Sequence, residues 1–121
     1  MKPLNSSDIV KFLERFDDFK GSEIRSLEIV SQTEVEMTLT AQDKARAFDW
    51  VTVTIKFFDI RDAQLIEEKK LNFIDMSEGI TFINDAGIFA FGVGKFTRIE
   101  AIKESSFYIV SKTIKYQEGT F

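Results

Sequence analysis

The sequence predicts an α+β fold that is mostly β: one N-terminal helix packed on antiparallel sheet of about six to eight strands. Three observations support this class. Apolar residues recur at helical spacing over residues 5–20, they alternate with polar residues over much of residues 23–116, and turn-forming residues separate the alternating runs. With 121 residues, the chain is expected to form a single domain, residues 1–121, built as a sandwich or as one strongly curved sheet.

Residues Asn5–Phe19 are expected to form an amphipathic helix. Asn5, Ser6 or Ser7 can cap its start, and Gly21 is suited to end it. Charged side chains occupy the opposite side, so the helix can cover a sheet with one face and meet water with the other. The apolar face contains Ile9, Phe12, Leu13, Phe16 and Phe19.

The next segment predicts an antiparallel hairpin, because the apolar period changes to two after Glu23. Leu27 and Ile29 belong to the first strand and Val35–Leu39 to the second, with a tight connection between them. Residues Ala41–Ala47 are expected to form a polar loop.

Residues Phe48–Phe58 give the strongest strand pattern in the chain. Apolar side chains fall on both faces of this strand, which predicts a central strand that is covered on both sides. One face carries Val51, Val53, Ile55 and Phe57, and the other carries Phe48, Trp50 and Phe58.

Residues Asp59–Lys70 are ambiguous, because good helix formers follow a β-rich run. We predict that a strand continues through Leu65 and Ile66, with a helix as the alternative. Farther on, Asn84–Gly87 is a turn signature that predicts a second hairpin ending in a strand over Ile88–Val93.

The C-terminal part predicts a connector followed by a long final strand. Residues Lys95–Glu104 are expected to contain a helical turn, Ser106–Tyr116 to form the strand, and Gln117–Phe121 to fray. A period of two would place five residues on one face of this strand: Tyr108, Val110, Lys112, Ile114 and Tyr116.

The composition excludes several function classes. The chain has no His and no Cys, which removes disulfides, thiolate nucleophiles, Cys/His zinc sites and Ser-His-Asp arrangements. We therefore expect no cofactor and no catalytic residue. The 16 basic and 20 acidic residues give a net charge of -4, which disfavours nucleic acid and anionic membranes as partners. The lack of Cys and of any signal-like or membrane-length apolar stretch favours the cytoplasm.

With Cys and His absent, a metal site could be formed only from acidic side chains. Asp59, Asp62, Asp75 and Glu78 fall where strands are expected to give way to turns, and converging carboxylates can hold a hard cation. Acidic residues at strand ends more often serve solvation and turn hydrogen bonds. A carboxylate-dependent metal enzyme is accordingly the third hypothesis for function.

Aromatic residues support the first two hypotheses. The chain has 13 Phe, and rings on both faces of a strand need a cover, which another protein chain could supply. The first hypothesis is a protein-binding module, with a protein partner or a second copy held through Trp50, Phe58, Tyr108 and Tyr116. The second is a carrier that holds a small apolar ligand in a Phe-lined cavity.

The order of the first strands resembles small bacterial all-β families of unknown function, some of which are assigned as immunity proteins that neutralise polymorphic toxins. The similarity lies in Ser22–Ile29, Val35–Leu39, Trp50–Val53 and Phe57–Ile60. Such families often open the first strand with a His-Asp pair, and Gly21–Glu23 takes that place here. The resemblance implies a protein-binding role and no catalytic residue.

Overall fold

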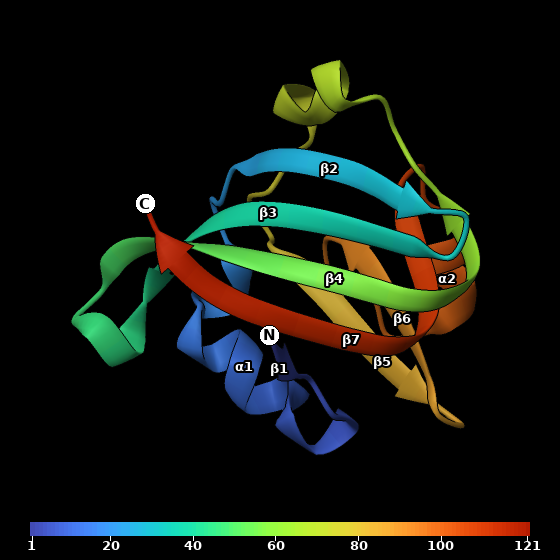
Figure 1. Cartoon of the computed structure of the whole chain (residues 1–121), viewed down its shortest axis with the longest axis horizontal. Helices are drawn as coiled ribbons and strands as arrows, with labels where there is room; N and C mark the ends of the chain where they lie inside the picture. The colour runs from blue at the N-terminus through green and yellow to red at the C-terminus, as the bar shows by residue number, and fades with distance from the viewer.

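The computed structural model describes residues 1–121 and contains a single antiparallel sheet of seven strands that does not close into a barrel. The strand order is β2-β3-β4-β7-β6-β5, and β1 pairs with β7 at Lys115 and Tyr116, beyond the residues of β7 that pair with β6 (Figure 1). The mostly β, α+β class predicted from the sequence is confirmed. The strands are β1 Lys2–Pro3, β2 Ile24–Ser31, β3 Glu34–Asp43, β4 Asp49–Gln64, β5 Ile80–Asp85, β6 Ile88–Val93 and β7 Tyr108–Thr120.

Helical segments are short. The two α-helices are α1, Ile9–Arg15, and α2, Ile99–Lys103, and neither has the length and apolar run that a membrane crossing requires. The 3-10 segments are η1 Ser6–Asp8, η2 Asp17–Phe19, η3 Lys44–Arg46 and η4 Glu68–Phe73.

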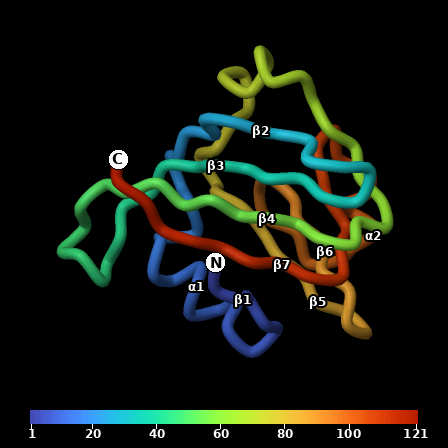
Figure 2. The backbone as a smooth tube through the Cα atoms, in the orientation of Figure 1, coloured from blue at the N-terminus to red at the C-terminus, as the bar shows by residue number.

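Two long strands bend the sheet. β4 has 16 residues and pairs with β3 only along Asp49–Phe57, and β7 has 13 residues and pairs with β6 near its start and with β1 farther on. In β4, Asp59 adopts a φ of 55° and the pairing with β7 shifts register between Ile60 and Asp62. Such an irregularity bends the strand and increases its twist. As a result β5 and β6 run obliquely behind β4 and β7 (Figure 1 and Figure 2).

The inner face of the bent sheet holds the main core. Helix α1 packs there, and the ring of Phe12 lies 4.7 Å from that of Tyr116 on β7 and 6.4 Å from that of Phe82 on β5. The Phe91 ring lies 5.5 Å from that of Phe57. The Phe excess therefore fills this core. Its fully buried members include Phe16, Phe19, Met37, Leu39, Val53, Ile55, Phe57, Phe91, Ile109 and Ile114.

A smaller core lies on the outer face of the sheet. Helix α2 covers the outer side of β6 and of the first half of β7, where Ala90, Ile102, Tyr108 and Val110 form a buried cluster. No helix covers the outer side of the other half of the sheet, formed by β2, β3 and the adjoining parts of β4 and β7.

Both predicted hairpins are confirmed. β2 and β3 pair with Ser31 opposite Glu34, and β5 and β6 pair with Asp85 opposite Ile88. The second turn contains Ala86 at a φ of 51° and Gly87 at a φ of 79°. Two consecutive positive φ values are typical of a type I′ turn, whose twist matches that of antiparallel strands.

The N-terminal helix is shorter than predicted. The expected helix over residues 5–20 is divided into η1, α1 and η2, because Asp17, Asp18 and Phe19 adopt φ values of 53°, 55° and 60°. This reversal brings the Phe19 ring within 5.4 Å of the Phe16 ring, and both side chains are buried. Aromatic burial therefore overrides helix continuation.

Three other boundaries predicted from the sequence are wrong. Leu65 and Ile66 lie after the end of β4 and form no strand, and β3 extends into the expected loop Ala41–Ala47 as far as Asp43, after which η3 begins. The segment Gln117–Phe121 was expected to fray, but β7 continues to Thr120, which pairs with Val51. Pairing with a central strand stabilises this polar segment.

The face prediction for the last strand is also wrong. Tyr108 and Val110 lie in the α2 cluster, whereas Ile114 and Tyr116 pack on the α1 side. The period of two is interrupted where β7 pairs with the irregular segment of β4 that follows Asp59. The central position predicted for β4 is confirmed, but Trp50 on its outer side remains 44% exposed.

Candidate functional site

The half of the sheet that α2 leaves uncovered presents a broad outer surface. Burial alternates along β4 from Val51 to Phe58, with the odd-numbered side chains buried and the even-numbered ones partly exposed. The same alternation on β3 and the cross-strand register place polar side chains outward on the neighbouring strands. We define the open outer face by Glu28, Glu36, Trp50, Lys56, Phe58 and Lys115.

A row of four charged residues crosses the open outer face. Glu28 on β2 lies opposite Glu36 on β3, which lies opposite Lys56 on β4, which lies opposite Lys115 on β7. The row therefore reads acid, acid, base, base from one strand to the next. Like charges directly opposite each other destabilise a sheet. This row is a local electrostatic conflict, which is expected at functional sites more than elsewhere.

Phe58 lies within the basic part of this row. The Nζ of Lys56 is 5.1 Å from the centre of its ring and the Nζ of Lys115 is 5.3 Å from it. Cation–π attraction therefore holds both ammonium groups beside the Phe58 ring. Lys56 also makes an ion pair of 3.8 Å with Glu34.

An aromatic cluster lies on the same face, where β7 ends and β4 begins. The ring of Trp50 is 5.8 Å from that of Phe121, and the Arg25 guanidinium lies 4.4 Å from the Phe121 ring. Arg25 also donates a hydrogen bond of 3.1 Å to the Phe121 carbonyl. Trp50 is 44% exposed and Phe121 60% exposed. Trp and Arg are enriched among the residues that dominate protein interfaces.

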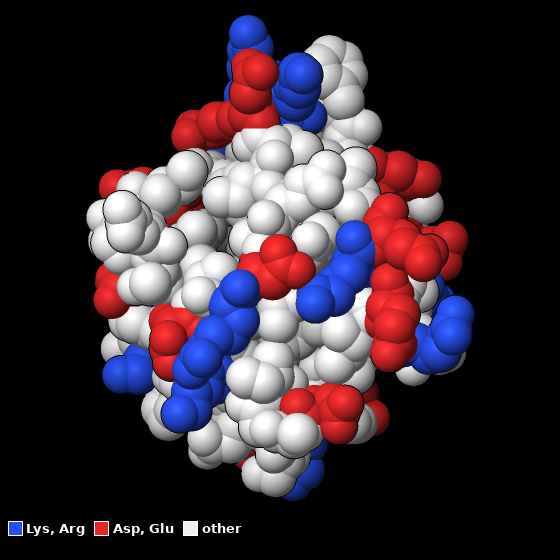
Figure 3. All heavy atoms as spheres, turned by 90° about the vertical axis from the view of Figure 1, so that its right-hand side faces the viewer, with Lys and Arg blue, Asp and Glu red and all other residues white.

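Charge is mixed elsewhere on the surface. Figure 3 shows acidic and basic side chains interspersed over the end of the molecule that lies to the right in Figure 1, with acidic groups gathered along one side. On this side of the molecule, charges of both signs therefore alternate locally and no single large field forms.

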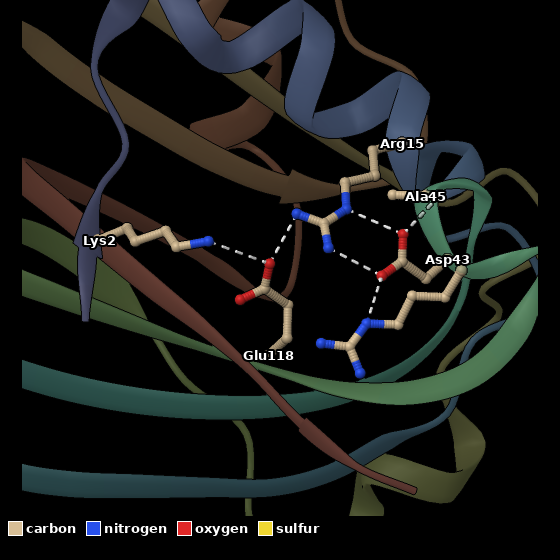
Figure 4. Close-up of polar contacts among 6 residues, drawn as sticks. Lys2, Arg15, Asp43, Ala45 and Glu118 are labelled. Carbon is tan, nitrogen blue, oxygen red and sulfur yellow. Dashed lines mark hydrogen bonds and ion pairs between the residues drawn. The ribbon is translucent and has the colours of Figure 1, made fainter.

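The most strongly coupled charges lie on the inner face, where Arg15 of α1 meets two carboxylates (Figure 4). Its Nε and Nη2 donate to Asp43 at 2.8 Å each, and its Nη1 lies 2.6 Å from Glu118 Oε1. The Asp43 carboxylate also accepts a bond of 2.9 Å from the Ala45 backbone. The Lys2 ammonium lies 3.5 Å from Glu118.

These contacts shift three pKa values. The hydrogen bonds from Arg15 lower the pKa of Asp43, although its burial opposes this. Burial also acts against ionisation of Glu118, but the hydrogen bonds that its carboxylate accepts from its own backbone and from Arg15 lower its pKa. The pKa of Arg15 is raised, chiefly by Asp43. Because each of the three guanidinium nitrogens of Arg15 is engaged, this network joins α1 to the ends of β3 and β7.

Two of the four acidic candidates are held in separate contacts. Asp59 pairs with Arg61 at 3.0 Å. Asp62 accepts a hydrogen bond of 3.2 Å from the Tyr108 hydroxyl and pairs with Lys103 at 3.5 Å. Burial and the neighbouring Asp62 carboxylate raise the pKa of Tyr108. Tyr108 is only 8% exposed and is held in the α2 cluster.

The other two acidic candidates also lie apart. Asp75 accepts a hydrogen bond of 2.9 Å from the Ser77 backbone N–H, which lowers the Asp75 pKa as a turn contact does. Glu78 is exposed beside β5. Nowhere in the structure do three acidic side chains converge closely enough to hold a metal ion.

The four aromatic candidates are divided between surfaces. Trp50 and Phe58 lie on the open outer face, Tyr108 lies under α2, and Tyr116 packs on Phe12 of α1 at the inner face. The sequence did not single out the Glu-Glu-Lys-Lys row. Each of its residues sits at an outward position of an alternating pattern, but only the register of four strands brings them into line.

A surface cleft lies between the η4 segment and the loop before β7. Its volume is about 290 Å³, which is near the lower limit of ligand pockets. Five of its lining residues are apolar and three are polar. They are Ile66, Phe73, Ile74, Val93 and Phe107, with Asp75, Ser105 and Ser106.

The open outer face thus combines aromatic and charged side chains that the fold leaves at least partly exposed, and it contains two of the four aromatic candidates. Our description of this face rests on the structure of this chain and not on any relative. No protein-family model, curated protein or solved structure matches the chain.

Proposed function

We propose that this protein acts by binding another protein through the open outer face. The observation that carries the proposal is the asymmetry of the outer side of the sheet: α2 covers one half, while the other half presents Trp50, Phe58 and a charged row to solvent. Trp and Arg side chains are enriched at the centres of surfaces that bind proteins, and polar side chains form the rims of such surfaces.

The resemblance of the first strands to small bacterial all-β families of unknown function, some of which are assigned as toxin-immunity proteins, is consistent with the same class of function. Immunity proteins act by covering another protein, which requires a contact surface and no catalytic group. We propose the cytoplasm as the compartment, because a chain without Cys suits a reducing environment.

Affinity capture with matched variants tests the proposal. The tagged protein and a Trp50→Ala variant are exposed to lysate of the source cells, with a Phe73→Ala variant as the control. Phe73 is a suitable control because its side chain is 86% exposed and lies on η4, outside the open outer face. We expect the wild type and Phe73→Ala to retain the same protein and Trp50→Ala to lose it. Identical retention by all three would show that this face is not the binding surface.

A carrier of a small apolar ligand is the second candidate, and the cleft of about 290 Å³ favours it. The fluorescent probe anilinonaphthalene sulfonate becomes bright in apolar sites and tests this function. If the cleft takes apolar ligands, Phe73→Ala and Val93→Arg should reduce the emission of the bound probe, while Trp50→Ala should leave it unchanged. No emission above that of the free probe would exclude a carrier role for the cleft.

A further inference from the structure

The charged row on the open outer face is antisymmetric about the line between β3 and β4. Two acids, Glu28 and Glu36, lie on one side of this line, and two bases, Lys56 and Lys115, lie on the other. Each pair of like charges occupies directly opposite positions on neighbouring strands, where repulsion is strongest.

Contacts within the chain leave most of this row unneutralised. Glu28, Glu36 and Lys115 take part in no ion pair, and Lys56 pairs only with Glu34, at 3.8 Å. Asp59 and Arg61, by contrast, form an ion pair of 3.0 Å on the exposed surface. A partner that neutralises the row must present bases over β2 and β3 and acids over β4 and β7.

A second copy of this chain presents that arrangement. A two-fold axis parallel to the strands, lying over the line between β3 and β4, places Glu28 of one copy opposite Lys115 of the other. The same operation places Glu36 opposite Lys56. We propose that the open outer face is an isologous interface between two copies of this chain, an inference that rests on the proposed protein-binding function.

The charge pattern selects this axis over the alternative. A two-fold axis in the plane of the interface but perpendicular to the strands would place Glu28 on Glu28 and Lys115 on Lys115, which repel. With the axis parallel to the strands, the two sheets pack with aligned strands, as in a β-sandwich. The small Thr38 and Thr54 side chains, whose hydroxyls lie 3.1 Å apart, occupy the centre of this contact and let the sheets approach.

Because the attraction comes from partly exposed charges, the dimer is weak and dependent on salt. It forms at high protein concentration and low ionic strength, and dissociates as salt is added. Trp50 and Phe121 lie toward the end of the face, where a second sheet would lower their exposure.

Charge reversal at the ends of the row tests the proposal. Glu28 and Lys115 are separated by two intervening strands within one copy but face each other between copies. We expect wild type to show twice the 13.9 kDa monomer mass by light scattering at low salt, and Glu28→Lys and Lys115→Glu each to dissociate about tenfold or more readily. An equimolar mixture of the two variants should dimerise again, because each reversed charge then faces an opposite one.

Controls separate this result from misfolding. Glu28→Lys removes the repulsion with Glu36, so the variant should melt no lower than wild type. Glu100→Lys and Lys95→Glu, which are exposed outside the face, should leave the dimer unchanged. A wild type that remains at 13.9 kDa, or a mixture that does not recover the dimer, would overturn the inference. If outer-face-dependent capture of a different protein persists in that case, the dimer is refuted while the protein-binding function stands.

Discussion

Arg15 and Asp43 are joined by two parallel hydrogen bonds of 2.8 Å, which connect the last residue of α1 to the last residue of β3. The Asp43 side chain is completely buried, whereas that of Arg15 is 26% exposed. A bidentate pair fixes orientation as well as distance. It therefore sets where the short helix lies on the inner face of the sheet.

Removal of the Asp43 carboxylate should destabilise the fold. Asp43→Ala leaves the Arg15 guanidinium without its bidentate partner, and we expect a loss of about 3 kcal/mol in the free energy of unfolding. Urea denaturation of the wild type and the variant measures this loss in the free energy of unfolding. Arg46→Ala is the matched control, because Arg46 is 60% exposed and only 3.7 Å from Asp43, and it should cost less than about 0.5 kcal/mol. Equal losses would show that the bidentate geometry has no special role.

Acid should unfold the protein through the same carboxylate. The pKa of Asp43 is lower in the folded chain than in the unfolded one, where it is about 3.9. Its contribution is therefore complete above the unfolded pKa and is lost as the pH falls through the folded pKa. Melting temperatures from pH 7 to pH 2 should decline below about pH 4. The decline should be shallower for Asp43→Ala, and parallel curves for both proteins would refute the assignment.

Gly79 should tolerate no side chain. A Cβ at this position would clash with the backbone carbonyl oxygen of Asp18, and the φ of Gly79 is +75°. Gly87 has a similar φ of +79° but open space around it. Gly87→Ala should cost about 1 kcal/mol from backbone strain, and Gly79→Ala about 3 kcal/mol or more because the backbone of η2 must move. Chemical denaturation of the two variants tests the difference, and comparable costs would contradict the close contact.

The Phe-rich inner face should carry much of the stability. Phe91 is completely buried and its ring contacts those of Phe57, Phe82 and Phe107 at 5.5, 5.6 and 5.7 Å. Phe91→Ala should lower the free energy of unfolding by about 3–5 kcal/mol. Phe73→Ala, at an exposed ring, should change it by less than about 0.5 kcal/mol. A small effect at Phe91 would mean that the core can collapse around the cavity.

Local pattern predicted the hairpins well, because alternation and turn chemistry act within a few residues. Asn84–Gly87 needs no tertiary contact to favour a turn, and the structure forms it at Ala86 and Gly87. Gln117–Phe121 has the composition of a frayed end, and its residues as far as Thr120 form strand only because β4 offers a partner. That stabilisation comes from β4 residues that are distant in sequence, so the composition of the tail itself does not predict it.

Long-range register explains what the sequence could not predict about the candidate surface. Asp59 changes which face the later residues of β4 and β7 occupy, so Tyr108 and Tyr116, expected on one face, lie on opposite faces. The charged row is likewise visible only once four strands are aligned. Trp50 and Phe58 could be selected from sequence because a single strand determines their common direction.

Lysine labelling in living cells tests most directly whether a protein covers the open outer face. An acetylating reagent is applied to cells that produce the protein and to the purified, dilute protein at low lysine conversion, and mass spectrometry reports each site. Lys115 should be protected in cells relative to the dilute protein, while Lys69, 79% exposed on η4, should react equally in both. Equal reactivity of Lys115 in the two samples would contradict the account, because the face would then be uncovered where the protein works.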